Sequence, residues 1–146
     1  MYRKLIKMNK SKKIILTISI IIYIISLTQE GFCTTAGQCA KGFLDVLVGW
    51  MGVLILHLPA MVWLANPILI LSWVVNKRHK KASFAYSIIA FVLMLSFLLF
   101  DEIMVNESGA LSRITSYGLG YWLWVSSAFI MVLGNAFLFY KKKKEV

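Results

Sequence analysis

The sequence predicts an all-α membrane protein, built as a bundle of four transmembrane helices. The chain of 146 residues is 60% hydrophobic and only 15% charged, whereas a soluble domain is roughly 45–50% apolar and about a quarter charged. Its apolar residues form long runs, and most basic residues lie in short clusters beside these runs. One soluble core of this length could not bury so much apolar surface, so lipid is the expected environment.

Three of the apolar runs each have the length of one membrane span. We expect helices at about residues 14–29, 82–100 and 120–140. At about 1.5 Å per residue, each of these helices covers most of a hydrocarbon layer about 30 Å thick. The first is a little short, but Lys12 and Lys13 can reach from its end to the headgroups.

The second apolar run, residues 43–75, is too long for one upright span and too short for two. Pro59 removes a backbone donor inside this run, which predicts a kink. The residue before a proline avoids the helical region. We therefore place the second span at about 43–65, with a helix break at Asn66-Pro67, and expect 67–76 to be a short inner or interfacial segment.

The basic residues predict the orientation of the chain. Residues 1–13 hold six of them, residues 77–81 hold four and residues 141–144 hold four, which leaves only Lys41 and Arg113. All three clusters fall on one side of a four-span chain, so the positive-inside rule places both termini in the cytoplasm. A five-span chain would put basic clusters on both sides, and we reject it.

The same charge pattern indicates the partner and the compartment. A net charge of +10 could suggest nucleic acid. However, the basic residues flank apolar runs and form no basic face interleaved with aromatic residues on a polar domain, so we expect no nucleic acid as a partner. The expected surroundings are the lipid bilayer of a plasma membrane, in a bacterium, with the chain as a multi-pass protein.

A cleaved signal peptide is the alternative interpretation of the first run, because a basic segment precedes it. The residues after Thr28 are Gln-Glu-Gly-Phe-Cys, which lack the small-residue pair of a cleavage site. A lipoprotein site would need a small residue before Cys33, and Phe32 stands there. We therefore favour an uncleaved first helix.

Cys33 and Cys39 are the only cysteines, and both fall in the first outer loop. An oxidising outer face favours a disulfide between them, which contributes roughly 2 kcal/mol for so short a loop. The alternatives are two free thiols or a redox-active pair, although redox pairs more typically have C-x-x-C spacing. Two cysteines are too few to bind a metal ion, and we expect no cofactor.

Four polar residues within the helical runs form a candidate intramembrane site: His57, Asp45, Asn66 and Asn135. A histidine at membrane depth suggests proton or ligand handling, while a neutral imidazole bonded to a neighbouring helix is the simpler interpretation. Asp45 suits a helix N-terminus or the mouth of an ion path. A break at Asn66 exposes carbonyl groups to a ligand in some transporters, or simply ends a helix. Asn135 is expected to hydrogen-bond another helix.

Small residues recur at helical spacing in two of the predicted helices: Gly42, Gly49 and Gly52 in the second, and Gly120, Ser127 and Gly134 in the fourth. Such stripes let helix backbones approach closely. They predict packing either within the bundle or across the seam of a homodimer, and the sequence does not separate these two possibilities.

The second outer segment, residues 101–119, is polar and holds four charged residues. Its Asn106-Glu107-Ser108 matches the glycosylation sequon, which is short enough to occur by chance. We expect this segment to be a mobile loop.

No catalytic signature is present: we find no nucleotide-binding glycine loop, no H-E-x-x-H and no G-x-S-x-G. We therefore do not expect an enzyme. The plan of the chain is similar to that of several small bacterial membrane proteins, including immunity proteins against pore-forming bacteriocins, and shared architecture does not fix function.

Three hypotheses of function follow. The first is a protein that acts by intramembrane or surface contacts, as an accessory, assembly or immunity-type factor, with another membrane protein or a second copy as its partner. The second is a subunit of a small homo-oligomeric transporter or channel. The third is a membrane thiol redox enzyme that uses Cys33 and Cys39.

Overall fold

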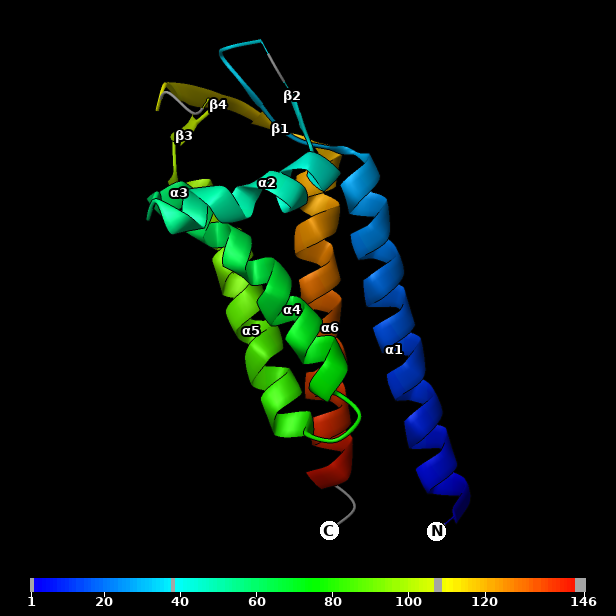
Figure 1. The fold of residues 1–146 in the computed structure, drawn as a ribbon. Coiled ribbons are helices and arrows are strands. Elements are labelled where there is room, and N and C mark those ends of the chain that lie inside the picture. Colours follow the sequence, from blue (N-terminus) through cyan, green and yellow to red (C-terminus); the bar gives the residue numbers. More distant parts are fainter. Residues whose placement is uncertain (1, 38, 107–108, 144–146) are drawn as a thin grey trace.

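The computed structural model describes residues 2–37, 39–106 and 109–143. Four of its helices are long and apolar enough to cross a membrane. A four-stranded antiparallel sheet lies at one end of these helices, and the ends of the chain lie at the other (Figure 1). The fold is therefore mostly helical, as predicted, but it is not all-α.

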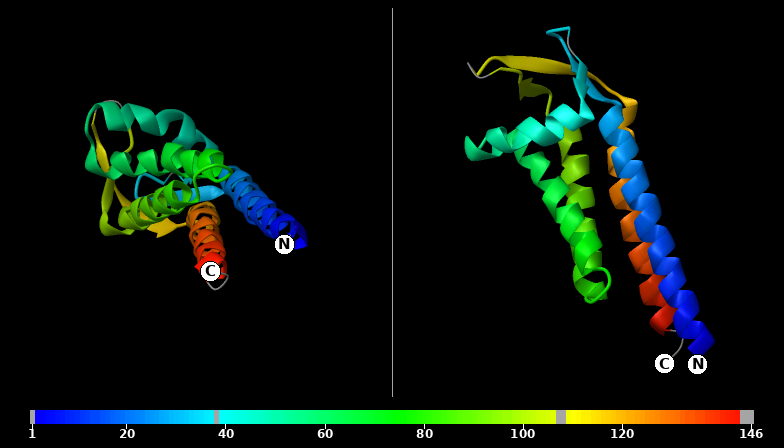
Figure 2. Two further views of the ribbon diagram at one scale, coloured as in Figure 1. Left: turned by 90° about the horizontal axis from the view of Figure 1, so that it is seen from below. Right: turned by 45° about the vertical axis from the view of Figure 1, so that its right-hand side comes forward.

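Helices α1 (Tyr2–Thr28) and α6 (Leu119–Lys143) lie side by side along most of their length (Figures 1 and 2). Gly134 makes this contact possible, because a Cβ atom there would overlap the Ile15 side chain. At the sheet end, a Cβ on Gly120 would come within 2.7 Å of the Glu30 carbonyl oxygen. The stripe predicted in the fourth helix thus packs within one chain, against α1 at Gly134 and against the start of β1 at Gly120.

The second apolar run forms two helices instead of one kinked span. Helix α2 (Gly42–Leu54) runs crosswise to the other helices at the sheet end (Figure 1). After a turn at residues 55–57, the chain continues through α3 (Leu58–Met61), the 3-10 turn η1 (Val62–Leu64) and α4 (Ala65–Val75). The second helix of membrane-spanning length is therefore Leu58–Val75 and not 43–65.

The helix break lies just before Pro59, and not at Asn66-Pro67. Leu56 adopts a left-handed conformation with φ of 55°, which turns the chain sharply. Pro59 then sits in the first turn of α3, where a missing N–H costs little. Pro67 lies inside α4, so residues 67–76 belong mainly to this long helix and are not a separate inner segment.

Helix α5 (Lys80–Ser96) returns antiparallel to α4 and ends in the 3-10 turn η2 (Phe97–Leu99). The two helices are joined at their ends by a short turn, in which the His79 N–H donates to the Val75 carbonyl at 2.8 Å. The apolar core lies where α4, α5 and α6 meet, and its fully buried side chains include Leu69, Met94 and Met131.

The sheet is built from the two segments predicted as loops. Strands β1 (Glu30–Thr34) and β2 (Cys39–Lys41) come from the first, and β3 (Glu102–Met104) and β4 (Leu111–Tyr117) come from the second. The strand order is β2-β1-β4-β3, with all neighbours antiparallel.

The predicted mobile loop at 101–119 is thus corrected over most of its length. Its strand β4 pairs with both β1 and β3 at the centre of the sheet. The alternating sequence of β4 includes Ile114 and Tyr117, residue types that favour strands. We call residues 30–41 and 101–117 the sheet end.

Candidate functional site

The polar residues identified in the sequence do not form one site. Asn66 and Asn135 lie in the helix core, while Asp45 lies at the start of α2 and His57 at its far end. Asn66 contacts Trp124 of α6, and Asn135 lies eleven residues further along that helix, which is about 16 Å. The fold therefore does not place these four residues along a single polar path.

Asn66 connects three helices through its side-chain amide. Its Oδ1 accepts hydrogen bonds from the Tyr23 hydroxyl of α1 at 3.0 Å and from the Trp124 indole of α6 at 2.8 Å. Its Nδ2 donates to the Trp63 carbonyl at 3.0 Å. That carbonyl would normally accept from the N–H of residue 67, which is a proline, so Asn66 replaces the missing backbone donor. The Trp63 carbonyl also accepts from a backbone N–H at the end of η1, so it stays paired where the helix passes Pro67.

A second polar contact lies nearer the middle of the bundle and was not predicted. The Ser19 hydroxyl of α1 donates to the Ser127 carbonyl of α6 at 2.8 Å. The same oxygen accepts from the Trp73 indole of α4 at 3.0 Å. The sequence signal for this contact is weak, because a serine in an apolar run has many possible partners.

The third polar contact joins α4, α5 and α6. The Ser72 and Ser83 hydroxyls each donate to the other residue's carbonyl, both at 2.9 Å. Asn135 Nδ2 donates to the Ser83 hydroxyl at 3.1 Å and to the Ser87 hydroxyl at 3.4 Å. All four side chains are buried. The predicted interhelical bond of Asn135 is thus present, and its role here is to hold helices together.

His57 lies in the turn between α2 and α3, at the level of the sheet, and not within a spanning helix. Its Nε2 accepts a hydrogen bond from the Met104 backbone N–H at 3.3 Å, which joins this turn to β3. An open apolar cavity of about 450 Å³ adjoins the turn, lined by residues 55–59 together with Phe100 and Met104. The imidazole is the only ionisable group among the residues that line it.

Asp45 lies in the first turn of α2, as predicted, and is half-buried. Its carboxylate faces β1, since a Cβ on Gly31 would lie 3.3 Å from Asp45 Oδ2. Desolvation by this burial raises the pKa of Asp45 to about 7. Lys41 is the residue before α2 and makes no side-chain cap. The carboxyl group is therefore set to change its charge near neutral pH.

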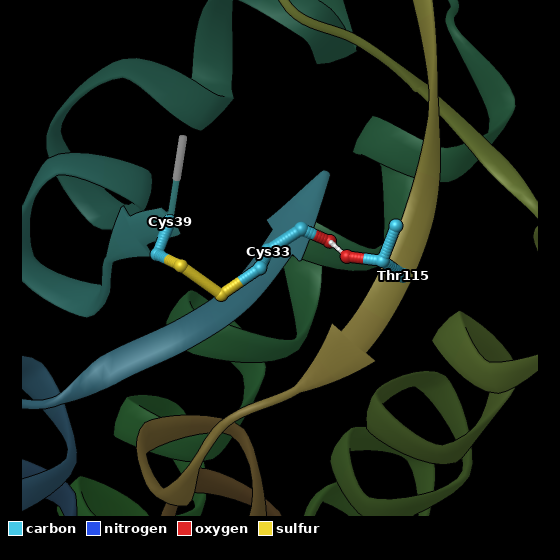
Figure 3. The surroundings of a disulfide bond; sticks show 3 residues. All are labelled: Cys33, Cys39 and Thr115. Carbon is cyan, nitrogen blue, oxygen red and sulfur yellow. Dashed lines mark hydrogen bonds between the residues drawn. A yellow bond between two sulfur atoms is a disulfide. The ribbon is translucent and has the colours of Figure 1, made fainter. Parts of the chain in front are cut away.

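Cys33 and Cys39 form a disulfide, with 2.00 Å between their sulfur atoms. They face each other across the β1–β2 hairpin, which turns through Gly37 at φ of 76°. The Thr115 hydroxyl of β4 donates to the Cys33 carbonyl at 3.1 Å (Figure 3). The disulfide thus fixes the hairpin, and Thr115 attaches it to the rest of the sheet.

The carboxylate of Glu30 is a further potential metal ligand beside this disulfide. A carboxylate oxygen of Glu30 and the sulfur atoms of Cys33 and Cys39 all lie within 4.8 Å of one another. Metal ions bind thiolates, and both sulfur atoms here are bonded to each other. The group is therefore arranged as a disulfide, and a metal could bind it only after reduction.

Helix α2 carries a broad apolar surface at the sheet end. None of its residues is fully buried, and its exposed side chains are almost all apolar: Phe43, Leu44, Leu47, Val48, Trp50, Met51 and Leu54. The opposite side packs closely, because a Cβ on Gly49 would overlap the Trp63 ring and one on Gly52 would overlap Ala60. The predicted glycine stripe of the second helix is thus used for contacts within the chain.

Comparison with models of protein families, with curated proteins and with solved structures finds no match.

Proposed function

We propose that this chain is a multi-pass plasma-membrane protein, with the sheet end outside the cell and both termini in the cytoplasm. The four long apolar helices support membrane insertion. The three basic segments all lie at the end of the bundle opposite the sheet (Figure 1), which agrees with the positive-inside rule. The disulfide lies at the sheet end, where an oxidising compartment would preserve it.

The function we propose is contact with another protein through the sheet end, as an accessory, assembly or immunity-type factor. The observation that carries this proposal is that the two polar segments outside the long helices form one ordered sheet, closed by a disulfide. Ordered polar surfaces of this kind suit recognition, because little conformational entropy is lost on binding. The sheet also presents charges of both signs, with Glu102 directly opposite Arg113.

The hydrogen bonds of the helix core favour a structural role for the long helices over a role in ion or substrate transport. Several of its buried amides and hydroxyls are used in bonds between helices, among them Asn66, Ser19 and Asn135. Such bonds fix helices relative to one another. The sheet end is therefore attached to a bundle whose helices are held together by hydrogen bonds.

Topology is tested first with single cysteines in a Cys33→Ser/Cys39→Ser background. Thr115→Cys, in β4, should react with a membrane-impermeant maleimide on intact cells. Lys81→Cys, at the start of α5, should react only after the cells are permeabilised. The opposite pattern would refute the orientation, and release of the chain by alkaline carbonate would refute membrane insertion.

The contact surface is tested with photoreactive amino acids placed at Thr115 and Ser116, which are both exposed on β4. The matched control is Leu133, which is 52% exposed on α6. The proposal expects one discrete adduct from the β4 positions and none of that mass from Leu133. An adduct of twice the chain mass would identify a second copy as the partner. Equal, diffuse labelling from all positions would refute a specific surface.

A thiol redox role is a second candidate, because Cys39 is exposed on the edge strand β2. A redox enzyme requires both thiols, so Cys33→Ser and Cys39→Ser would each abolish its activity while the chain stays folded. A structural disulfide predicts only a loss of stability. Trapping a mixed disulfide from Cys33→Ser would favour the redox role.

A further inference from the structure

A groove runs between α1 and α4, toward the end of the bundle opposite the sheet. Its volume is about 400 Å³, and its walls are almost entirely apolar: Leu16 and Ile20 from α1, Ile70, Trp73 and Val74 from α4, and Lys77. From Ile70 to Lys77 the groove follows seven residues of chain, or roughly 10 Å of helix. Its lining would suit the first part of one acyl chain.

At the end nearer the sheet, the groove is closed by contacts between the two helices that line it, α1 and α4. The Trp73 indole donates to the Ser19 hydroxyl, which joins α4 to α1. The Trp73 ring also packs edge-to-face against Tyr23, with 5.3 Å between the ring centres. The groove is therefore held open at a fixed width, and a ligand would enter from the side or from the basic end.

Ammonium groups gather at the lower end of the groove. Lys77 lines it directly. Lys12 lies one turn before Leu16 on the same face of α1. The Lys12 and Lys80 side chains approach closely enough for their ammonium groups to repel each other. Such crowding of like charges raises the free energy of the unliganded protein, and a bound anion would relieve it.

No carboxylate offsets this charge in the part of the chain that the structure describes. Four acidic residues of that part lie at the sheet end or beside it: Glu30, Asp45, Asp101 and Glu102. The groove therefore combines an apolar channel with a basic mouth that no carboxylate of the described residues offsets. Basic pockets between transmembrane helices on the cytoplasmic side suit anionic lipid headgroups.

We propose that this groove binds one anionic phospholipid of the cytoplasmic leaflet, with an acyl chain along Leu16, Ile20 and Val74 and the phosphate between Lys12, Lys77 and Lys80. This inference rests on the membrane insertion proposed above and adds a specific ligand class. Lipid is preferred over a free anion because the apolar walls and the basic mouth are continuous.

The test is native mass spectrometry of the purified, delipidated protein, titrated in detergent with dioleoyl phosphatidylglycerol or dioleoyl phosphatidylcholine. We expect one phosphatidylglycerol to be retained at least tenfold more tightly than phosphatidylcholine. Near a membrane surface, each lysine contributes about 1 kcal/mol to binding an anionic lipid, so Lys12→Gln/Lys77→Gln should weaken retention roughly 25-fold.

Two further variants separate charge from shape. Lys41→Gln/Arg113→Gln removes the same charge at the sheet end and should leave lipid retention unchanged. Val74→Trp fills the groove without changing charge, and Val74 is 67% exposed, so folding should tolerate it. We expect Val74→Trp to weaken phosphatidylglycerol binding at least fivefold. Unfolding midpoints of all variants, measured without added lipid, should be no lower than that of the unaltered chain.

Several outcomes would overturn the proposal. Equal retention of both lipids, or equal loss in both double variants, would show that no specific anionic site exists. Glycerol phosphate that competes as well as the whole lipid would show a free-anion site with no role for the groove. If the cysteine labelling places the chain in the membrane while lipids bind without preference, only this inference fails. If that labelling fails, the proposed topology fails with it.

Discussion

Replacing Asn66 by leucine should destabilise the bundle more than any other single substitution of a core amide. The change removes three hydrogen bonds at once: those from Tyr23 and Trp124 and the one to the Trp63 carbonyl. Hydrogen bonds between membrane helices contribute on average about 0.6 and at most about 1.7 kcal/mol each. The expected loss in the free energy of unfolding is therefore about 2–5 kcal/mol.

The loss should come mainly from the hydrogen bonds, because leucine has the same number and branching of side-chain heavy atoms as asparagine. A donor left unpaired in an apolar core costs about 1–3 kcal/mol. Here the Tyr23 hydroxyl and the Trp124 indole would be left without their acceptor, while the Trp63 carbonyl keeps a backbone donor. Tyr23→Phe removes only one of these bonds and should cost about 0.6–1.7 kcal/mol. The double variant Tyr23→Phe/Asn66→Leu should therefore cost less than the sum of the two single changes.

The assay is reversible unfolding in mixed micelles with increasing dodecyl sulfate, followed by circular dichroism. Thr17→Leu, at an exposed position of α1, is the control for adding leucine to a helix and should leave stability nearly unchanged. The reasoning is refuted if Asn66→Leu costs no more than Thr17→Leu. It is also refuted if the two single changes add within about 0.3–0.5 kcal/mol, the range expected of independent sites.

Three further predictions concern α2, the turn that follows it and the sheet end. Burial raises the pKa of Asp45 to about 7 in the folded chain, so the folded state binds more protons than the unfolded state between about pH 4 and pH 7. The free energy of unfolding should therefore fall as pH rises through this window, by up to about 4 kcal/mol. Melting curves recorded at several pH values should show this dependence, and Asp45→Asn should abolish it. Leu56 has a φ of 55° and an exposed side chain. Leu56→Gly should therefore raise the free energy of unfolding by up to about 1 kcal/mol, whereas Leu56→Val should lower it by about 1–2 kcal/mol, as measured by thermal midpoints. Cys33→Ser/Cys39→Ser should lower stability by roughly 2 kcal/mol and leave the helical circular dichroism signal intact; loss of that signal would show that the bundle depends on the disulfide.

The long helices could be predicted because they follow from composition and length alone. The structure has helices of spanning length at Lys10–Thr28, Lys80–Leu99 and Leu119–Leu138, within a few residues of the predicted first, third and fourth spans. A charge-free run of about twenty residues leaves few alternatives. The charged residues beside each run limit its ends in the same way.

The second span was misplaced because a side chain compensated for a proline. The rule that a helix ends before Pro67 assumes that the freed carbonyl has no donor. The Trp63 carbonyl here accepts from the Asn66 amide and from a backbone N–H, so the helix continues. Pro59 predicted a kink in this run, and the break at residues 55–57 lies just before it. The left-handed turn at Leu56 was not predicted, because neither glycine nor proline stands at the turning residue.

The sheet could not be predicted because its central pairing is not local. Strand β1 pairs with β4, which lies more than 75 residues later in the chain. Each strand alone is short and polar, and only the helix ends bring the two segments together. The β1–β2 hairpin could have been predicted from the sequence, because the disulfide between Cys33 and Cys39 spans a turn that contains Gly37.

The polar residues of the helix core carry the clearest lesson about site prediction. A polar group in an apolar run is a functional hypothesis by default, yet Asn66 and Asn135 each find partners on other helices. Serine makes such contacts at more positions than asparagine does, at Ser19, Ser72, Ser83 and Ser87. Because many of the core's buried polar groups find partners on other helices, recognition is better sought at the two ends of the bundle. There the sheet and the basic groove present polar and charged side chains at the surface.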